Sequence, residues 1–171
     1  IVVAGIHRGY EGLLERDIHS LSSDDVAGII QRGGTVLNTA RSKKFSTPEG
    51  LHLAAANLRE AGIEGLIVAG GDGSMRGADL LSRAEGISTI VVPGTIDYDM
   101  NGTDYTFGFD TALNNILDAV NKIRDTADSH QRVAVVEVMG RCSGQLALMS
   151  GRSCGAEIIL IPEIHVAMSD V

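Results

Sequence analysis

This sequence has few of the features that mark secreted, membrane-bound or nucleic-acid-binding proteins. It holds only two cysteines among 171 residues, too few for a disulfide framework or a metal-binding cysteine quartet. No apolar run reaches the roughly 18 residues of a membrane span, and the apolar start at residues 1–4 lacks the basic flank of a signal peptide. A net charge of −8 argues against duplex nucleic acid as a partner. We therefore expect a cytoplasmic protein with no membrane and no nucleic-acid partner.

What the sequence does contain is typical of an α/β protein. Its 44% hydrophobic residues and 21 glycines favour a globular fold with many tight turns. Strand patterns alternate with helix patterns, which predicts a doubly wound, mostly parallel sheet with helices on both faces. The length fits one domain, so we expect a single α/β domain over residues 1–171. The chain starts at Ile1 in a strand pattern and stops after an acidic stretch, so we expect it to be part of a longer protein.

Short apolar runs between turn residues predict strands, and apolar residues at spacings of three and four predict helices. The expected strands span residues 1–6, 66–69, 88–92, 133–138 and 158–161. Those at 66–69 and 88–92 lack polar alternation, so we expect both of their faces to be buried, and we expect Pro93 to end the second. The expected helices span about 22–32 (capped by Ser22 or Ser23), 48–61, 74–84, 108–127 and a stretch from 143.

The most informative segment is a glycine turn that follows the apolar stretch Leu66–Ala69. Its residues Gly70-Gly71-Asp72-Gly73-Ser74 lead into a helix. Glycines let backbone N–H groups approach a bulky anion, and a helix N-terminus favours negative charge. The carboxylate of Asp72 would repel a bare phosphate, but it can hold a Mg²⁺ ion that the phosphate shares. The segment therefore predicts a site for a metal–polyphosphate such as Mg-ATP. The alternative is a tight turn in which Asp72 caps the helix.

A second polar loop follows the apolar strand pattern at 88–92. It places two carboxylates, Asp97 and Asp99, two residues apart. Asp97 can take a proton from a substrate hydroxyl, and Thr95 can hydrogen-bond the reacting group. Asp99 can help with Mg²⁺ or orient Asp97. The alternative is an Asx-type turn with solvated acids. Because ligands of open parallel sheets bind at the carboxyl ends of strands, we expect both loops at one edge.

Together these loops and two later segments resemble the ATP-dependent 6-phosphofructokinase family, and the resemblance covers essentially the whole chain in order. The segments that carry it are Gly70-Gly71-Asp72-Gly73-Ser74, Pro93-Gly94-Thr95-Ile96-Asp97, Ser129-His130-Gln131-Arg132 and Val138-Met139-Gly140-Arg141. The resemblance implies transfer of the ATP γ-phosphoryl group to the 1-hydroxyl of fructose 6-phosphate, giving fructose 1,6-bisphosphate. It implies the N-terminal, ATP-binding half of such a chain, without the family's N-terminal glycine-rich loop and its C-terminal half. Such a segment is expected to be inactive by itself.

The resemblance also assigns roles to individual residues. Asp97 would be the general base with Thr95 beside it, and Asp72 would hold Mg²⁺. Arg132 would reach the 6-phosphate bound by a neighbouring subunit, which implies a homo-oligomer, a tetramer in the complete protein. The implied ATP-binding residues are Tyr10, Arg41, Ser42, Gly71, Asp72, Gly73 and Ser74. The implied sugar-phosphate residues are Thr95, Ile96, Asp97, Arg132, Met139, Gly140 and Arg141.

Several alternatives remain open at this point. Members of the family that use pyrophosphate place an aspartate at position 73 and a lysine at 94, and the glycines here leave that space open to ATP. Tyr98 stands where the family usually has asparagine. Arg124 matches the family's regulatory site but Ser23 does not, so control by ADP or phosphoenolpyruvate stays open. The other readings are a pyrophosphate-dependent enzyme, a lipid or nicotinamide dinucleotide kinase, and a non-catalytic nucleotide-binding fragment.

Overall fold

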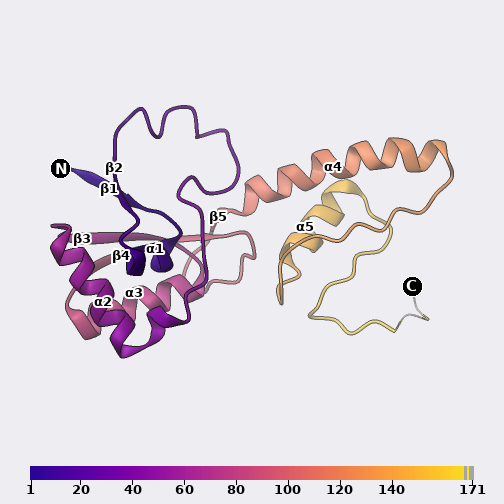
Figure 1. The fold of residues 1–171 in the computed structure, drawn as a ribbon. Coiled ribbons are helices and arrows are strands. Elements are labelled where there is room, and N and C mark those ends of the chain that lie inside the picture. Colours follow the sequence, from indigo (N-terminus) through magenta and orange to yellow (C-terminus); the bar gives the residue numbers. More distant parts are fainter. Residues whose placement is uncertain (168, 170–171) are drawn as a thin grey trace. The chain divides into compact units, whose positions relative to one another are not determined.

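The computed structural model describes residues 1–167 and 169, and its internal contacts group into two compact units, Ile1–Val92 and Pro93–Val171. The expectation of one α/β domain over the whole chain stays a prediction. In chain order the elements are β1 (Val3–Ile6), α1 (Gly9–Glu15), β2 (Ile18–Leu21), the short 3-10 helix η1 (Lys44–Ser46), α2 (Pro48–Glu60), β3 (Gly65–Gly70), α3 (Asp72–Glu85), β4 (Ser88–Thr95), β5 (Phe107–Gly108), α4 (Phe109–Ser129) and α5 (Gln145–Cys154) (Figure 1).

The core of the first unit is built around helix α2. The Thr47 side chain accepts a hydrogen bond from the Gly50 N–H at 3.1 Å and caps this helix, and Pro48 occupies its first turn, as the sequence predicts. One face of the helix is fully buried against α1 and α3, and each buried leucine contributes about 1.5–3 kcal/mol. The buried apolar side chains that line this contact include Leu13, Ala54, Ala55, Leu58 and Leu81.

A buried amide ties α2 to the end of α1. Asn57 is only 2% exposed, and its side-chain nitrogen donates to the carbonyls of Leu13 at 2.9 Å and Leu14 at 3.2 Å. These carbonyls lie in the last turn of α1, where helical partners run out, and the Leu13 carbonyl otherwise accepts only a long bond of 3.5 Å from the Arg16 N–H among the described residues. The amide therefore supplies close donors to two acceptors that are costly to bury without them.

Two sheets are present among the described residues. Strands β1 and β2 pair antiparallel, with Val3 opposite Leu21 and Ile6 opposite Ile18. The second sheet has the order β3-β4-β5, and β4 and β5 are parallel, with Gly94 opposite Phe107. The antiparallel pair was not predicted. It forms because α1 ends at Arg16 in a left-handed conformation with a φ of 62°, which turns the chain back along β1.

Several expected elements of the first unit differ in the structure. The helix predicted over 22–32 is absent: the Ser22 hydroxyl donates to the Asp25 carboxylate at 2.7 Å, but the chain then makes only turns. Gly28, with a φ of +67°, has a left-handed backbone conformation that an α-helix over these residues would not contain. Strand β3 alternates exposed and half-buried residues, and Ile67 is 75% exposed, so the prediction of two buried faces was wrong. Strand β4 also alternates at first and continues through Pro93 to Thr95.

The second unit contains helices α4 and α5. Helix α4 confirms the long helix expected over 108–127, and the Arg124 guanidinium donates to the carbonyl of Cys154 at the end of α5. The strands predicted over 133–138 and 158–161 are not formed within the described part of the chain, where Val133 and Val135 are 93% and 95% exposed. A strand needs a neighbour to accept its backbone hydrogen bonds, and these segments have none among the described residues.

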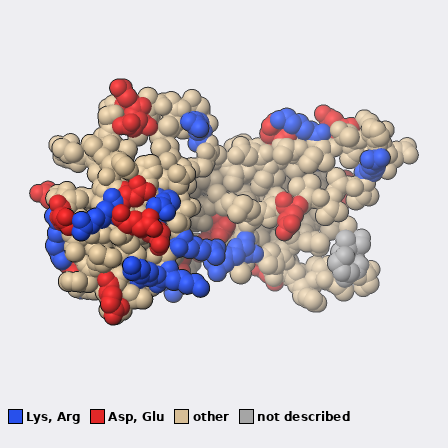
Figure 2. Space-filling model, in the orientation of Figure 1, with Lys and Arg blue, Asp and Glu red and all other residues tan. Residues whose placement is uncertain are grey.

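Charged side chains of both signs intermingle on the first unit. Figure 2 shows lysine, arginine and acidic side chains next to one another there, and the ion pairs include Arg16 with Glu60 and Arg83 with Asp79, each at 2.7 Å. Exposed pairs of this kind contribute at most about 1 kcal/mol each, so packing rather than charge holds this unit together. Within residues 1–167 and 169, no helix is long and apolar enough to cross a membrane.

Candidate active site

The glycine turn of the first unit connects β3 to α3. Gly71 is the N-cap of α3 and has extended backbone angles, and Asp72 is the first helical residue, two positions earlier than predicted. Among the described residues no side chain caps this helix. The backbone N–H groups of Asp72 and Gly73 therefore remain available to an anion, and the helix dipole adds to their attraction, whereas the N–H of Ser74 donates to the Gly71 carbonyl at 3.0 Å.

Asp72 forms an ion pair instead of a cap. Its carboxylate lies 2.9 Å from Nε of Arg76, one turn along the helix, and the two side chains are 59% and 77% exposed. An exposed pair at this spacing is weak, about 0.3–0.5 kcal/mol, so a metal ion can displace Arg76. No group of three or more metal-ligating side chains occurs among the described residues. The single carboxylate of Asp72 fits Mg²⁺, which takes one or two protein carboxylates and fills its remaining positions with phosphate oxygens and water.

Two glycines of this turn, Gly70 and Gly73, differ in the space around them. A Cβ placed on Gly70 would lie 2.4 Å from Oγ of Ser74, whereas a Cβ placed on Gly73 would meet nothing within 4 Å. Gly70 is therefore required by packing. Gly73 borders open space, where a larger side chain would occupy room that a ligand can use.

Tyr10 supports the first turn of α3. Its hydroxyl donates to the backbone carbonyl of Ser74 at 2.6 Å, and its ring stacks on Phe45 with the ring centroids 3.9 Å apart. Burial raises the pKa of Tyr10 to about 12, so this hydroxyl stays protonated and remains a donor. Ser42 accepts a hydrogen bond from the N–H of Phe45 at 3.2 Å, while Arg41 is exposed.

The loop after β4 presents Asp97 in the second unit. The N–H of Asp97 donates to Oγ1 of Thr95 at 3.1 Å, so the two residues predicted to act together are in contact through the backbone. Partial burial is the main cause that raises the pKa of Asp97, and the negative charge of Asp99 adds to it. The positive charge of Arg141 acts in the opposite direction and lowers this pKa.

Met139, Gly140 and Arg141 line a cavity of about 280 Å³ within the second unit, together with the start of α5. Gly140 has a φ of +142°, and a Cβ there would lie 2.4 Å from the carbonyl oxygen of Ser143, so only glycine fits. Met139 is 73% exposed. Its side chain is therefore available to a ligand rather than being used to pack a core.

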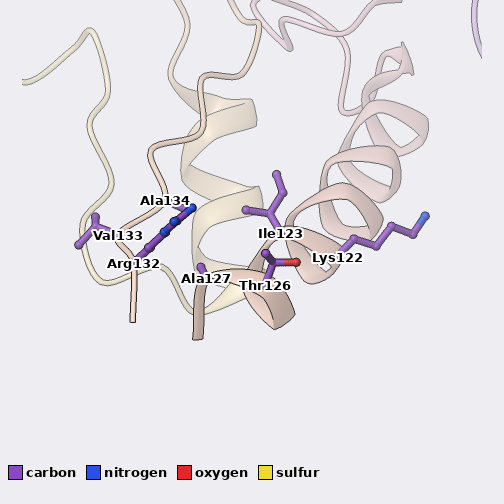
Figure 3. Close-up of a pocket in the computed structure, with 7 residues that line it drawn as sticks. All are labelled: Lys122, Ile123, Thr126, Ala127, Arg132, Val133 and Ala134. Carbon is purple, nitrogen blue, oxygen red and sulfur yellow. The ribbon is translucent and has the colours of Figure 1, made fainter. Parts of the chain in front are cut away.

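Arg132 lines a different hollow, of about 390 Å³, between the end of α4 and residues 132–134. Figure 3 shows the Arg132 side chain extending from this segment toward the helix that carries Ile123 and Thr126. The backbone N–H of Arg132 donates to the carbonyl of Ala127 at 2.9 Å, which fixes the turn between the helix and the segment. Within the second unit, Arg132 and Arg141 thus line two separate hollows.

A model of the family described as phosphofructokinase matches residues 1–171. This chain belongs to the phosphofructokinase family. It is 57% identical over 169 residues to the ATP-dependent 6-phosphofructokinase of Halothermothrix orenii, covering 99% of this chain and 51% of the relative. It is 55% identical over 172 residues to that of Staphylococcus epidermidis, covering 100% of this chain and 53% of the relative. The chain thus spans about half the length of the curated relatives it matches.

Solved structures agree on the fold. The structure of phosphofructokinase from Saccharomyces cerevisiae matches with a TM-score of 0.84 and 43% identity, over 95% of this chain and 25% of that one. A pyrophosphate-dependent phosphofructokinase from Marinobacter aquaeolei matches with a TM-score of 0.79 and 24% identity, over 97% of this chain and 45% of that one, which supports the fold alone. The predicted α/β fold with a parallel sheet, like that of phosphofructokinases, is confirmed.

Sequence reasoning missed two residues that support the candidate site. Arg76 pairs with Asp72, and Phe45 stacks on Tyr10. The pair of Asp72 with Arg76 could have been predicted from the sequence, because the two residues are four positions apart, the spacing of neighbours on a helix. The stacking of Phe45 had no such signal, since Phe45 lies 35 residues from Tyr10 in the sequence. The contact with Phe45 depends on how η1 packs against α1 and could not be derived from local patterns.

Proposed function

We propose that the complete protein containing this chain transfers the γ-phosphoryl group of Mg-ATP to the 1-hydroxyl of fructose 6-phosphate. The observation that carries the proposal is Asp97: a partly buried carboxylate, bonded through its N–H to Thr95 and influenced by Arg141. Burial makes this carboxylate a stronger proton acceptor than an ordinary aspartate, as a general base requires. The identity to ATP-dependent relatives over this segment supports the assignment.

The residues of the first unit fit the ATP side of this reaction. Phosphoryl transfer needs positioning and charge neutralisation more than covalent chemistry. At the uncapped N-terminus of α3, the N–H groups of Gly71 and Gly73 and the side chain of Ser74 would bind the phosphates, while Asp72 would hold Mg²⁺, which neutralises phosphate charge when bound. Tyr10 and Ser42 position this region through Ser74 and Phe45, and the exposed Arg41 is free to reach the nucleotide.

The residues of the second unit fit the sugar-phosphate side. Asp97 accepts the proton of the 1-hydroxyl, and the Thr95 hydroxyl and the Ile96 backbone contact the reacting end of the sugar. Met139, Gly140 and Arg141 bind the sugar phosphate from the cavity they line. The Arg132 guanidinium pairs with the 6-phosphate bound by a neighbouring subunit, because its fork suits bidentate phosphate binding.

ATP is the proposed phosphoryl donor rather than pyrophosphate. The open space at Gly73 supports it, because an aspartate there would place bulk and negative charge where a third phosphate needs room. The relatives described above are ATP-dependent enzymes by name. We further propose a homotetramer in the cytoplasm, where the free thiols of Cys142 and Cys154 remain reduced.

The proposal is tested by replacing the base in the full-length enzyme. Asp97→Ser removes the proton acceptor, so turnover should fall by roughly 10²–10⁴-fold, while the KM values for fructose 6-phosphate and ATP change far less. Asp118→Ser is the matched control, because this carboxylate is exposed on α4 and forms its ion pair with Lys122 on the same helix. Near-normal turnover of Asp97→Ser would contradict the proposed role.

A further inference from the structure

The residue after the proposed base has an unusual backbone conformation. Tyr98 has a φ of 56°, in the left-handed region that bulky side chains rarely adopt. Glycine and asparagine adopt this region readily, whereas tyrosine does so only when its surroundings hold it there. The contacts of Tyr98 therefore need an explanation beyond ordinary packing.

Both ends of the Tyr98 side chain are held. The phenol hydroxyl donates to the backbone carbonyl of Asp104, on the returning side of the loop. The ring lies 4.6 Å from the ring of Phe109, centroid to centroid, at 35°, and 6.4 Å from that of Tyr105 at 66°. Phe109 is 5% exposed and is the first residue of α4, so the ring of Tyr98 packs on a fixed, buried support.

These contacts fix the backbone next to Asp97. While Tyr98 keeps its φ, the peptide plane between Asp97 and Tyr98 keeps its orientation relative to Tyr98. On the other side, the N–H of Asp97 donates to Oγ1 of Thr95. Thr95 before Asp97 and Tyr98 after it thus restrain the backbone from which the Asp97 carboxylate projects. A general base must stay within hydrogen-bond reach of the proton it takes, and small displacements lower the rate strongly.

We propose that Tyr98 is a positioning residue that keeps the left-handed turn after Asp97 and so holds the Asp97 carboxylate in one direction. The inference rests on the proposed role of Asp97 as proton acceptor. Tyr98 acts through the backbone, and it is not assigned any contact with substrate.

Three variants of the full-length enzyme separate positioning from packing. Tyr98→Ala loses the hydroxyl hydrogen bond and the ring contacts, and alanine has no preference for positive φ. Its kcat should therefore fall about tenfold or more, while the KM for ATP stays within about twofold. Tyr98→Asn also lacks the ring, but asparagine adopts the left-handed region on its own, so it should recover most of the lost kcat. Tyr98→Phe keeps the ring and loses only the hydroxyl, and its kcat should lie between those of wild type and Tyr98→Ala.

Two outcomes would overturn the inference. One is a Tyr98→Ala enzyme with kcat within about twofold of wild type. The other is a Tyr98→Asn enzyme that is folded, by thermal melting, yet as slow as Tyr98→Ala, since the ring would then act by packing alone. Each variant is melted alongside wild type, so that a loss of folding is seen separately from a loss of rate.

A double variant separates this inference from the proposed function. If Tyr98 acts through Asp97, adding Tyr98→Ala to Asp97→Ser should lower turnover no further, because the group being positioned is already gone. A full additional tenfold loss would overturn the inference. Near-normal turnover of Asp97→Ser alone would instead reject the proposed role of Asp97, whatever the Tyr98 variants show.

Discussion

The hydroxyl of Tyr10 donates a hydrogen bond to the backbone carbonyl of Ser74 at 2.6 Å, linking helix α1 to the first turn of α3. Tyr10→Phe removes this bond and keeps the stacking on Phe45. Because the bond fixes a turn proposed to bind ATP phosphates, we expect the KM for ATP to rise about three- to tenfold, given about 1 kcal/mol for a net hydrogen bond. The KM for fructose 6-phosphate should not change. Steady-state kinetics with each substrate varied in turn measures both, and an unchanged KM for ATP would contradict the expectation.

Asp72→Ser tests the metal role in the glycine turn. Turnover should fall, and the Mg²⁺ concentration giving half-maximal activity should rise, because the ion loses its protein carboxylate. Asp79→Ser is a matched control, since Asp79 on the same helix also forms an ion pair with the arginine four residues later. The distance between Asp79 and Nε of Arg83 is 2.7 Å. A wild-type Mg²⁺ titration curve for Asp72→Ser would show that Asp72 serves only its ion pair with Arg76.

Gly73→Asp tests the choice of phosphoryl donor. The new carboxylate enters the open space at this position and should repel ATP by its bulk and charge, while pyrophosphate should suffer less. Gly73→Ala is the matched variant that adds bulk without charge. The measurement is the ratio of the specificity constants for the two donors. A ratio that stays within about twofold, or roughly 0.4 kcal/mol, means that Gly73 does not set the donor.

Arg132→Ala tests the shared site. The KM for fructose 6-phosphate should rise by tenfold or more with ATP affinity nearly unchanged, because a charged hydrogen bond to phosphate, about 1.5–3 kcal/mol, is lost. Lys122→Ala, which changes another cation lining the same hollow, should leave both KM values near wild type.

Mixing subunits then shows whose site Arg132 serves. Hybrids of Arg132→Ala and Asp97→Ser subunits would contain some sites with both lesions and some with neither. At a fructose 6-phosphate concentration well below the raised KM of Arg132→Ala, where both parents are slow, activity should therefore return on mixing. If subunit exchange is confirmed by mass and no activity returns, Arg132 does not serve a neighbouring subunit.

Asp97 also predicts a pH dependence of stability. Its pKa is raised in the folded state, chiefly by burial, so the folded protein holds this proton more tightly than the unfolded chain. Stability from this group is therefore greatest at low pH and falls as the pH rises from the unfolded value through the raised folded pKa. Asp97→Asn removes the cost of burying the charge, so its melting temperature should exceed that of wild type at pH 7. This gain should shrink as the pH is lowered toward 4, and a gain independent of pH would contradict the argument.

The sequence predicted helices correctly where their start depends on residues within one turn of chain. Helix α2 begins where Thr47 and Pro48 place it, because a cap and a first-turn proline act within one turn of chain. The helix expected after Ser22 fails although its cap contact to Asp25 forms. A single contact cannot offset the cost of nucleation when the following residues bury no apolar face.

The strands at 133–138 and 158–161 could not be settled from the sequence, because pairing depends on a neighbour that no local pattern specifies. For the candidate site, the glycine turn after a strand and the loop that carries Asp97 were predictable from residue type and spacing, and the chemical roles of their residues stay predictions. The support given by Phe45 to Tyr10, and by Phe109 to Tyr98, was not predictable, because it depends on tertiary packing.

The exposed valines of residues 133–138 have a consequence for handling the protein. The run Val133-Ala134-Val135-Val136-Glu137-Val138 is rich in β-branched residues, carries one charge and contains no proline or glycine. Such a run with open backbone groups can stack with copies of itself. A half-length chain should therefore precipitate progressively with concentration, and Val135→Lys should keep it in solution. During synthesis, this stretch is where we expect a chaperone to bind the emerging half-chain.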